Sequence, residues 1–208
     1  MPNVLSETLS QVLTPVEIAP VVLKMPPAIE MTSGQFAEFC SLNRDLRIEY
    51  SAQGELIIMP PAFSDTGNRN FNLALQLGIW AERDGSGIGF DSSAGFTLPN
   101  GAVKSPDAAW LRLERWQTLS DQDKAAFAPI CPDFVVELKS ASDRLKDVQA
   151  KMQEYIENGT VLSWLIDRQK HQVHIYRPDA SIEILDHPSS VSGDPIMQGF
   201  TLDLSKIW

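Results

Sequence analysis

The stretch PDFVVELKS, residues 132–140, decides the fold class of this chain. Its centre, residues 134–139, is rich in β-branched and large apolar residues, which is typical of a β-strand. Side chains alternate between the two faces of a strand, so Glu137 and Lys139 share one face with Val135, while apolar side chains occupy the other. A strand that is apolar on both faces is usually interior to its sheet. We therefore expect a central strand that carries two charged side chains into the interior.

A second acid precedes this strand in a position from which it can reach Glu137. The segment Ser-Pro-Asp over residues 105–107 begins the preceding predicted strand. If the two strands are neighbours, Asp107 stands opposite Glu137 at a strand spacing of about 4.8 Å, and the two carboxylates can share a hard cation such as Mg²⁺. Asp133 also follows a proline, but it lies about 13 Å before Glu137 along the same strand at 3.3 Å per residue. Asp179, in a third Pro-Asp pair, falls in a late turn, so Asp107 is the preferred partner.

Glu137 and Lys139 also have a structural interpretation that needs no active site. They are separated by one position, and at the end of a strand they can form an ion pair that reaches water. Without such a partner, a charge in the interior of a sheet costs several kcal/mol. The two charges alone therefore do not distinguish an ion pair from a site.

Apolar periodicity, capping residues and turn signals outline the remaining elements. They predict helices over residues 31–43, 68–83 and 144–158, hairpins over 46–59 and 161–176, two strands between 89 and 116, a short helical insert from Ser120 and a further strand over 182–185. The apolar residues between Phe200 and Trp208 are expected to cover the core or an interface. Since helices and strands are interspersed without an internal repeat, the sequence predicts one mixed α/β domain.

The length and composition are those of one globular domain with an N-terminal arm. The chain has 208 residues, of which 43% are hydrophobic and 21% charged, values typical of globular proteins. Five of the 14 prolines fall in the first 27 residues, where they remove backbone donors and block regular helix. We therefore divide the chain into a proline-rich arm over residues 1–30 and one domain over residues 31–208.

The charge balance and the cysteines restrict the class of protein. With 17 Lys and Arg against 27 Asp and Glu, the net charge is −10, opposite to the basic footprint of a protein held on nucleic acid by its overall field. A nucleic-acid role must therefore rest on a local site. Cys40 and Cys131 form neither a disulfide framework nor a zinc motif, and no apolar run approaches the roughly 20 residues of a membrane span. These features predict a cytoplasmic protein without a membrane segment.

The acidic pair and the lysine together resemble the signature of the PD-(D/E)xK nuclease superfamily. Asp107 follows a proline, and Glu137 and Lys139 follow on the next predicted core strand in the order Glu-x-Lys. The resemblance implies that the two acids bind Mg²⁺ or Mn²⁺ and that the lysine orients water or stabilises the pentavalent phosphate. These residue types suit phosphodiester hydrolysis, in which a metal ion activates water and a nearby cation stabilises developing charge.

Further motifs are similar to those of the Uma-type restriction endonuclease family. They lie at residues 54–61, 66–70, 90–93, 105–110, 131–138 and 151–155. The resemblance extends over residues 31–208. It implies a restriction-endonuclease-like α/β fold, in which a central mixed β-sheet is flanked by helices and the metal site lies at an opened edge of the sheet.

The family pattern also implies roles for individual residues. Asp107 and Glu137 are the implied metal ligands, with the backbone carbonyl of Leu138 as a third ligand. Lys139 matches the superfamily lysine in the catalytic role. Lys151, on the following predicted helix, is the alternative source of that cation, because a helix packed beside the site can point a long side chain into it.

An acid from the first predicted hairpin often completes the site in this superfamily. Glu49 is the preferred residue, since the residues on either side of it, Ile48 and Tyr50, take the other face of the strand and Glu49 can point inward. Glu55, directly after Gly54, is the alternative and is as well explained as an exposed turn residue.

The residues and the resemblance together predict a metal-dependent endonuclease that hydrolyses phosphodiester bonds in DNA. A catalytically inactive or weak nuclease-fold module that binds a partner is the main alternative, and the acidic net charge favours it. A hydrolase that uses Asp107 and Glu137 on another kind of substrate is a third interpretation. A homodimer would suit the cutting of both strands of a duplex, and the proline-rich arm could exchange between its subunits.

Overall fold

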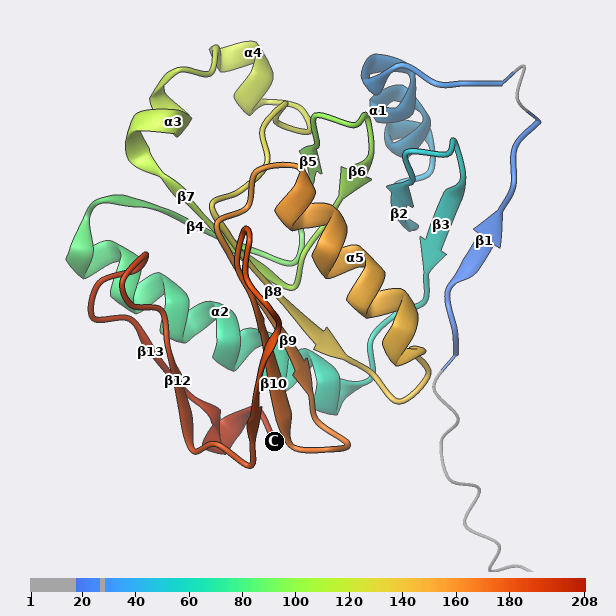
Figure 1. Cartoon of the computed structure of the whole chain (residues 1–208). Coiled ribbons are helices and arrows are strands. Elements are labelled where there is room, and N and C mark those ends of the chain that lie inside the picture. The colour runs from blue at the N-terminus through green and yellow to red at the C-terminus, as the bar shows by residue number, and fades with distance from the viewer. Residues whose placement is uncertain (1–17, 27–28) are drawn as a thin grey trace, which may run out of the picture.

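The structure is a computed structural model that describes residues 18–26 and 29–208 (Figure 1). Most of the predicted proline-rich arm therefore lies outside the described residues. Within the arm, strand β1 (Val21–Leu23) pairs antiparallel with β3 (Leu56–Met59). This part of the arm is therefore the edge strand of a sheet.

A six-stranded sheet forms the centre of the fold and has the strand order β11-β10-β9-β8-β7-β4. Strand β8 pairs in parallel with β9 and antiparallel with β7, so the sheet is mixed, as predicted. The strands are β4 (Gly87–Asp91), β7 (Ala108–Arg112), β8 (Phe134–Lys139), β9 (Leu162–Asp167), β10 (Gln172–Tyr176) and β11 (Glu183–Asp186).

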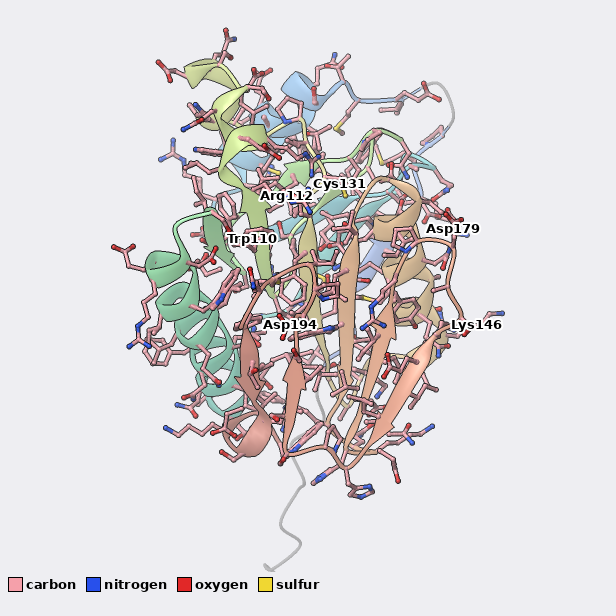
Figure 2. All side chains as sticks on the ribbon, turned by 60° about the vertical axis from the view of Figure 1, so that its left-hand side comes forward. Trp110, Arg112, Cys131, Lys146, Asp179 and Asp194 are labelled. Carbon is pink, nitrogen blue, oxygen red and sulfur yellow. The ribbon has the colours of Figure 1, made fainter. Side chains whose placement is uncertain are left out.

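Strand β8 is the interior strand that the sequence predicts, and all six of its residues are buried. One of its faces packs against helix α2 (Ser64–Asp84) and the small sheet of β12 (Ser190–Ser192) and β13 (Thr201–Asp203). Val135, on the other face, packs beneath helix α5 (Leu145–Glu157). Figure 2 shows α2 and α5 on opposite sides of the sheet. Both faces of β8 are covered because its side chains are apolar on both faces.

A second sheet has five strands in the order β1-β3-β2-β6-β5. Strands β2 (Arg47–Tyr50) and β3 form the first predicted hairpin, while β5 (Phe96–Thr97) and β6 (Val103–Lys104) have two residues each. The region between residues 87 and 112 thus holds four strands rather than the two predicted, because two-residue strands are too short to show an alternating pattern. Helix α1 (Ser33–Leu42) begins with a Thr32–Gln35 capping box and buries Phe36 against this sheet.

The two sheets meet at residues 105–107. Strand β6 of the smaller sheet ends at Lys104, and strand β7 of the central sheet begins at Ala108. Pro106 has no N–H to donate to a strand ladder, so the pairing is interrupted here. The chain therefore passes from one sheet to the other at the segment that carries Asp107.

The predicted helices are present, with small differences at their ends. Helix α2 begins at residue 64 rather than 68 and ends before Gly85, which adopts the left-handed conformation at φ 70°. The predicted insert is α4 (Asp121–Lys124), and it is preceded by α3 (Leu113–Gln117), which the sequence pattern does not predict. Apolar residues of α2 occupy two sides of the helix. Phe71 and Leu75 lie on the exposed side, whereas Leu73 and Leu77 lie on the side that is buried against the central sheet.

The C-terminal residues cover the core, which is the first of the two predicted alternatives. Phe200, Leu202 and Leu204 are all buried in the cluster that fills one face of the central sheet, and the chain ends after a short 3₁₀ helix (Leu204–Lys206). The ring of Phe200 stacks on Trp164 at a centroid distance of 5.8 Å and an interplanar angle of 9°. The C-terminal segment is therefore an integral layer of the domain.

Truncation of Phe200 should destabilise the protein strongly. Phe200→Ala leaves a cavity next to Trp164, and we expect the free energy of unfolding to fall by about 3–5 kcal/mol in urea titrations. Leu75→Ala, on the exposed face of α2, should cost no more than about 0.5 kcal/mol. Equal losses in the two variants would contradict the placement of Phe200 in the core.

His174 should make the fold sensitive to acid. This residue of β10 is buried, and among residues 18–26 and 29–208 neither of its ring nitrogens finds a hydrogen-bond partner. Burial lowers the pKa of His174 below its ordinary value of 6.5, with Asp167 opposing this shift and Lys170 adding to it. As the pH falls below 6.5, the unfolded chain takes up the proton before the folded protein does, so stability is lost in that range.

The replacement His174→Gln should therefore reduce the dependence of stability on pH between about pH 7 and pH 5, where this histidine titrates in the unfolded chain. The urea midpoint of the native protein should fall more steeply on acidification than that of the variant. His187→Gln, at an exposed histidine, is the matched control and should retain the native slope. An unchanged slope in His174→Gln would show that this histidine does not contribute.

Candidate active site

A pocket of about 130 Å³ opens where the two sheets meet. Its polar wall comes from both sheets, from α2 and from α5, while residues 59–63 form an apolar rim. The polar side chains around it include those of Arg47, Asn70, Asp107, Glu137 and Lys151. The predicted site residues Asp107, Glu137 and Lys151 thus lie around one cavity.

Asp107 is fixed by hydrogen bonds to both of its carboxylate oxygens. Oδ2 accepts the backbone N–H of Leu138 at 2.8 Å, and Oδ1 accepts Nδ2 of Asn70 at 3.1 Å. Burial raises the pKa of Asp107, while the Leu138 N–H and the charge of Arg47 oppose that shift. The carboxylate is therefore held in one orientation by a strand on one side and a helix on the other.

Glu137 lies beside Asp107, as the strand order predicts. Ala108, the residue after Asp107, pairs with Val136, the residue before Glu137. The Oε1 atom of Glu137 accepts the hydroxyl of Tyr155 at 3.0 Å and lies 2.8 Å from Nζ of Lys151. Burial raises the pKa of Glu137 to about 7; Lys151 opposes this shift, and the carboxylates of Asp107 and Glu49 reinforce it.

Lys151 connects two acids that belong to different sheets. Its Nζ lies 2.8 Å from Glu137 and 2.9 Å from Oε1 of Glu49. Burial alone would lower the pKa of Lys151, but the two carboxylates outweigh it and raise that pKa. The ammonium group is therefore charged and held between the two acids.

Glu49, rather than Glu55, points into the interior. Besides Lys151, it contacts Nζ of Lys104 at 3.9 Å and accepts the backbone N–H of Ser105 at 3.1 Å. Burial raises the pKa of Glu49, but Lys151 and Lys104 reverse this effect, so the net shift is downward. Glu55 instead lies 3.8 Å from Lys24, whose side chain is exposed.

Lys139 does not join this cluster, although it lies only two residues from Glu137. Its Nζ donates to Oε1 of Gln169 at 2.8 Å and to the carbonyl of Ser140 at 3.1 Å. Gln169 belongs to the turn between β9 and β10. Of the two lysines that the sequence proposes for catalysis, the structure therefore places Lys151 at the acids and Lys139 at a neighbouring turn.

Two comparisons with known proteins bear on this arrangement. The family model Uma2, described as “Putative restriction endonuclease”, matches residues 34–205. The chain belongs to the Uma2 family. No curated protein matches it. A crystal structure of “a putative nuclease belonging to DUF820 from Anabaena variabilis ATCC 29413” is similar to this Uma2 protein, with a TM-score of 0.64 and 19% identity over 80% of this chain and 90% of the other. This likeness shows the fold.

The donor set of this Uma2 protein fits a hard cation. Asp107 and Glu137 line the pocket together with Leu138, whose backbone carbonyl is the predicted third ligand. Over residues 18–26 and 29–208, no group of three or more His, Cys, Asp or Glu side chains is placed to share one ion. Mg²⁺ commonly binds through one or two carboxylates and keeps several waters. Asp107 and Glu137 therefore match the number of carboxylates that Mg²⁺ commonly uses.

Three polar residues at the site were not identified from the sequence. Asn70 and Tyr155 lie within the family motifs, but nothing in their spacing indicates that they donate hydrogen bonds to Asp107 and Glu137. Arg47 is the first residue of β2 and carries no motif signal. Their roles depend on contacts between elements that are far apart in the sequence.

Removal of the Lys151 charge should destabilise the fold. Lys151→Met leaves Glu49 and Glu137 buried without their shared cation, so we expect the free energy of unfolding to fall by about 3–5 kcal/mol at pH 8. Lys146→Met, on the exposed side of the same helix (Lys146 is labelled in Figure 2), should change it by no more than about 0.5 kcal/mol. The double variant Lys151→Met/Glu49→Gln should recover part of the lost free energy of unfolding, because it removes one of the two unpaired charges. Native stability of Lys151→Met in urea titrations would contradict the role of Lys151 as a bridge between Glu49 and Glu137.

Proposed function

We propose that this Uma2 protein is a metal-dependent endonuclease that hydrolyses phosphodiester bonds in DNA. The observation that carries the proposal is the convergence at one pocket of Asp107, which directly precedes β7, Glu137, on the adjacent strand β8, and Lys151. Membership of a family described as “Putative restriction endonuclease” supports the same chemistry. The free cysteines, Cys40 and Cys131, suit a reducing cytoplasm.

Each residue of the site has a distinct task in this proposal. Asp107, Glu137 and the carbonyl of Leu138 would hold Mg²⁺ or Mn²⁺, which when bound supplies an activated water and neutralises developing negative charge. Lys151 brings a second positive charge to the pocket wall, where it can stabilise the phosphate oxygens as the phosphodiester reacts. Lys139 would have to leave Gln169 to take that role. Tyr155 restricts the orientation of Glu137, and Glu49 that of Lys151.

One observation also favours a binding module without catalytic activity. The ammonium group of Lys151 already lies 2.8 Å from Glu137 and partly neutralises it, so the site carries an internal cation. The net charge of −10 adds a general repulsion towards nucleic acid. Metal binding distinguishes the two functions, since only the nuclease requires a divalent ion at these acids.

Substitution of either acid should weaken metal binding strongly and abolish cleavage. In calorimetric titrations with Mn²⁺, Asp107→Asn and Glu137→Gln should weaken binding by more than the 10- to 100-fold typical of an outer-shell change. Nicking of supercoiled plasmid in Mg²⁺ or Mn²⁺ should be lost in the same variants. Glu157→Gln, at an exposed carboxylate on α5, is the matched control and should behave as the native protein.

The outcomes separate the candidate functions. If both variants lose metal binding, but the native protein cleaves only a substrate that is not a nucleic acid, the protein is a hydrolase that uses Asp107 and Glu137 on another kind of substrate. An absence of metal binding and of cleavage in the native protein would favour the binding module. The homodimer remains a prediction, and light scattering that gives a mass of 23.1 kDa would contradict it.

A further inference from the structure

Arg47 lies at the pocket, and its guanidinium group makes few contacts with the described residues. It begins β2, lines the cavity and is partly buried. Its Nη2 donates to the backbone carbonyl of Ser105 at 3.0 Å. Its Nε is buried and has no hydrogen-bond partner among the described residues. Much of the donor capacity of this guanidinium group is therefore unused.

The positive charge of Arg47 is also unpaired. Within residues 18–26 and 29–208, no carboxylate forms an ion pair with it, whereas Lys151 and Lys104 each contact two acids. A cation that is partly removed from water without a counter-charge is costly, and it is normally retained where an anion completes the pair. Arg47 is thus the cation of the pocket wall whose charge is available to a ligand.

Neighbouring residues keep the nearest acids away from Arg47. Asp107 and Asp91 both lie within reach of its charge. That charge opposes the rise that burial causes in the pKa of Asp107, and it adds to the lowering that the hydrogen bonds of Ser93 cause in the pKa of Asp91. Asp107 is held instead by Leu138 and Asn70, while Asp91 accepts the backbone N–H and the hydroxyl of Ser93. The isolation of Arg47 is therefore built into the structure around it.

We propose that Arg47 is the anchor for a phosphate group of the substrate, which its guanidinium group binds through the non-bridging oxygens. A planar guanidinium matches the oxygens of a phosphate and forms charge-assisted hydrogen bonds with them. The phosphate would complete the missing ion pair and lie in the same pocket as Asp107 and Glu137. The assignment of this anion to a phosphodiester substrate rests on the proposed function, whereas the anion site itself can be tested without metal or cleavage.

The first test measures binding in EDTA, where no metal-dependent reaction can occur. Inorganic phosphate and a fluorescein-labelled single-stranded DNA of 12 nucleotides are titrated into the native protein and into Arg47→Gln, Arg47→Lys and Arg44→Gln. Arg44 is the matched control, because it is exposed and also donates to a backbone carbonyl, that of Ser41, at 3.0 Å. Thermal unfolding of each variant establishes that it is folded, and Arg47→Lys keeps the charge if Arg47→Gln does not fold.

The expected result is a dissociation constant at least tenfold higher in Arg47→Gln for both probes, an intermediate value in Arg47→Lys and a native value in Arg44→Gln. The slope of log affinity against log salt for the DNA should also fall by about one in Arg47→Gln, since one phosphate contact is lost. A purely structural arginine would leave that slope unchanged. Native affinity in folded Arg47 variants, an equal loss in Arg44→Gln, or no binding of either probe by the native protein would overturn the proposal.

The experiments distinguish a failure of the anion site from a failure of the proposed nuclease function. If phosphate binding depends on Arg47 while the native protein neither binds Mn²⁺ nor cuts DNA, the anion site stands and the nuclease does not. If DNA is cut through Asp107 and Glu137 while Arg47→Gln retains its affinity for both probes, the nuclease stands and the role of Arg47 is wrong.

Discussion

The hydrogen bond from the Leu138 N–H to the carboxylate of Asp107 is the interaction on which the arrangement of the site depends. Strand β8 extends to Lys139, but its ladder with β7 ends at the pair Ala108–Val136. Pro106 cannot donate an N–H to continue that ladder. The Asp107 side chain occupies the place of a backbone partner at Leu138, so the acid next to Glu137 is set by the way the sheet ends. The pocket lies at the same interruption, where the chain passes from one sheet to the other.

Charge compensation around Glu49 then fixes the rest of the cluster. Lys104 contacts Glu49 and Glu154, and Lys151 contacts Glu49 and Glu137, so acids and lysines alternate along one chain of contacts. Such buried pairs add little net stability compared with apolar packing, but the loss of one member leaves a buried charge without a partner. The alternation therefore constrains positions more than it stabilises the fold. Lys151 and Glu154 are three residues apart on α5 and lie on one side of the helix, so this helix supplies one end of the network, Glu154, and the lysine that contacts the other end, Glu137.

The central elements could be predicted from the sequence because their signals are local. Apolar residues on both faces of β8 identify an interior strand, and strand order then places Asp107 beside Glu137 without knowledge of any side-chain contact. The choice between Lys139 and Lys151 could not be made in this way. A long side chain at the end of a strand can turn towards whichever neighbour offers an acceptor, and for Lys139 that neighbour is Gln169, 30 positions away.

Other features depend on packing between distant elements and give no signal in one sequence. The periodicity of α2 identifies a helix, but two apolar stripes run along it, and only the central sheet determines that the stripe with Leu73 is buried while Phe71 is exposed. Arg47 belongs to the smaller sheet, and its position at the pocket depends on how that sheet meets the central one. The short strands β5 and β6 likewise exist through their pairing rather than through their composition.

The two oxygens of Glu137 show how one carboxylate can serve both the fold and the chemistry. Oε1 accepts the hydroxyl of Tyr155 and contacts Lys151, and within the described residues no hydrogen bond is made to Oε2. The contacts at Oε1 hold the side chain against α5, while the same carboxylate also lines the pocket beside Asp107. Salt screens the exposed charges of the surface beyond about 8 Å at physiological ionic strength, whereas the buried charges of this cluster are screened much less. For a ligand in the pocket, the balance of Asp107 and Glu137 against Lys151 and Arg47 therefore acts at closer range than the net charge of −10.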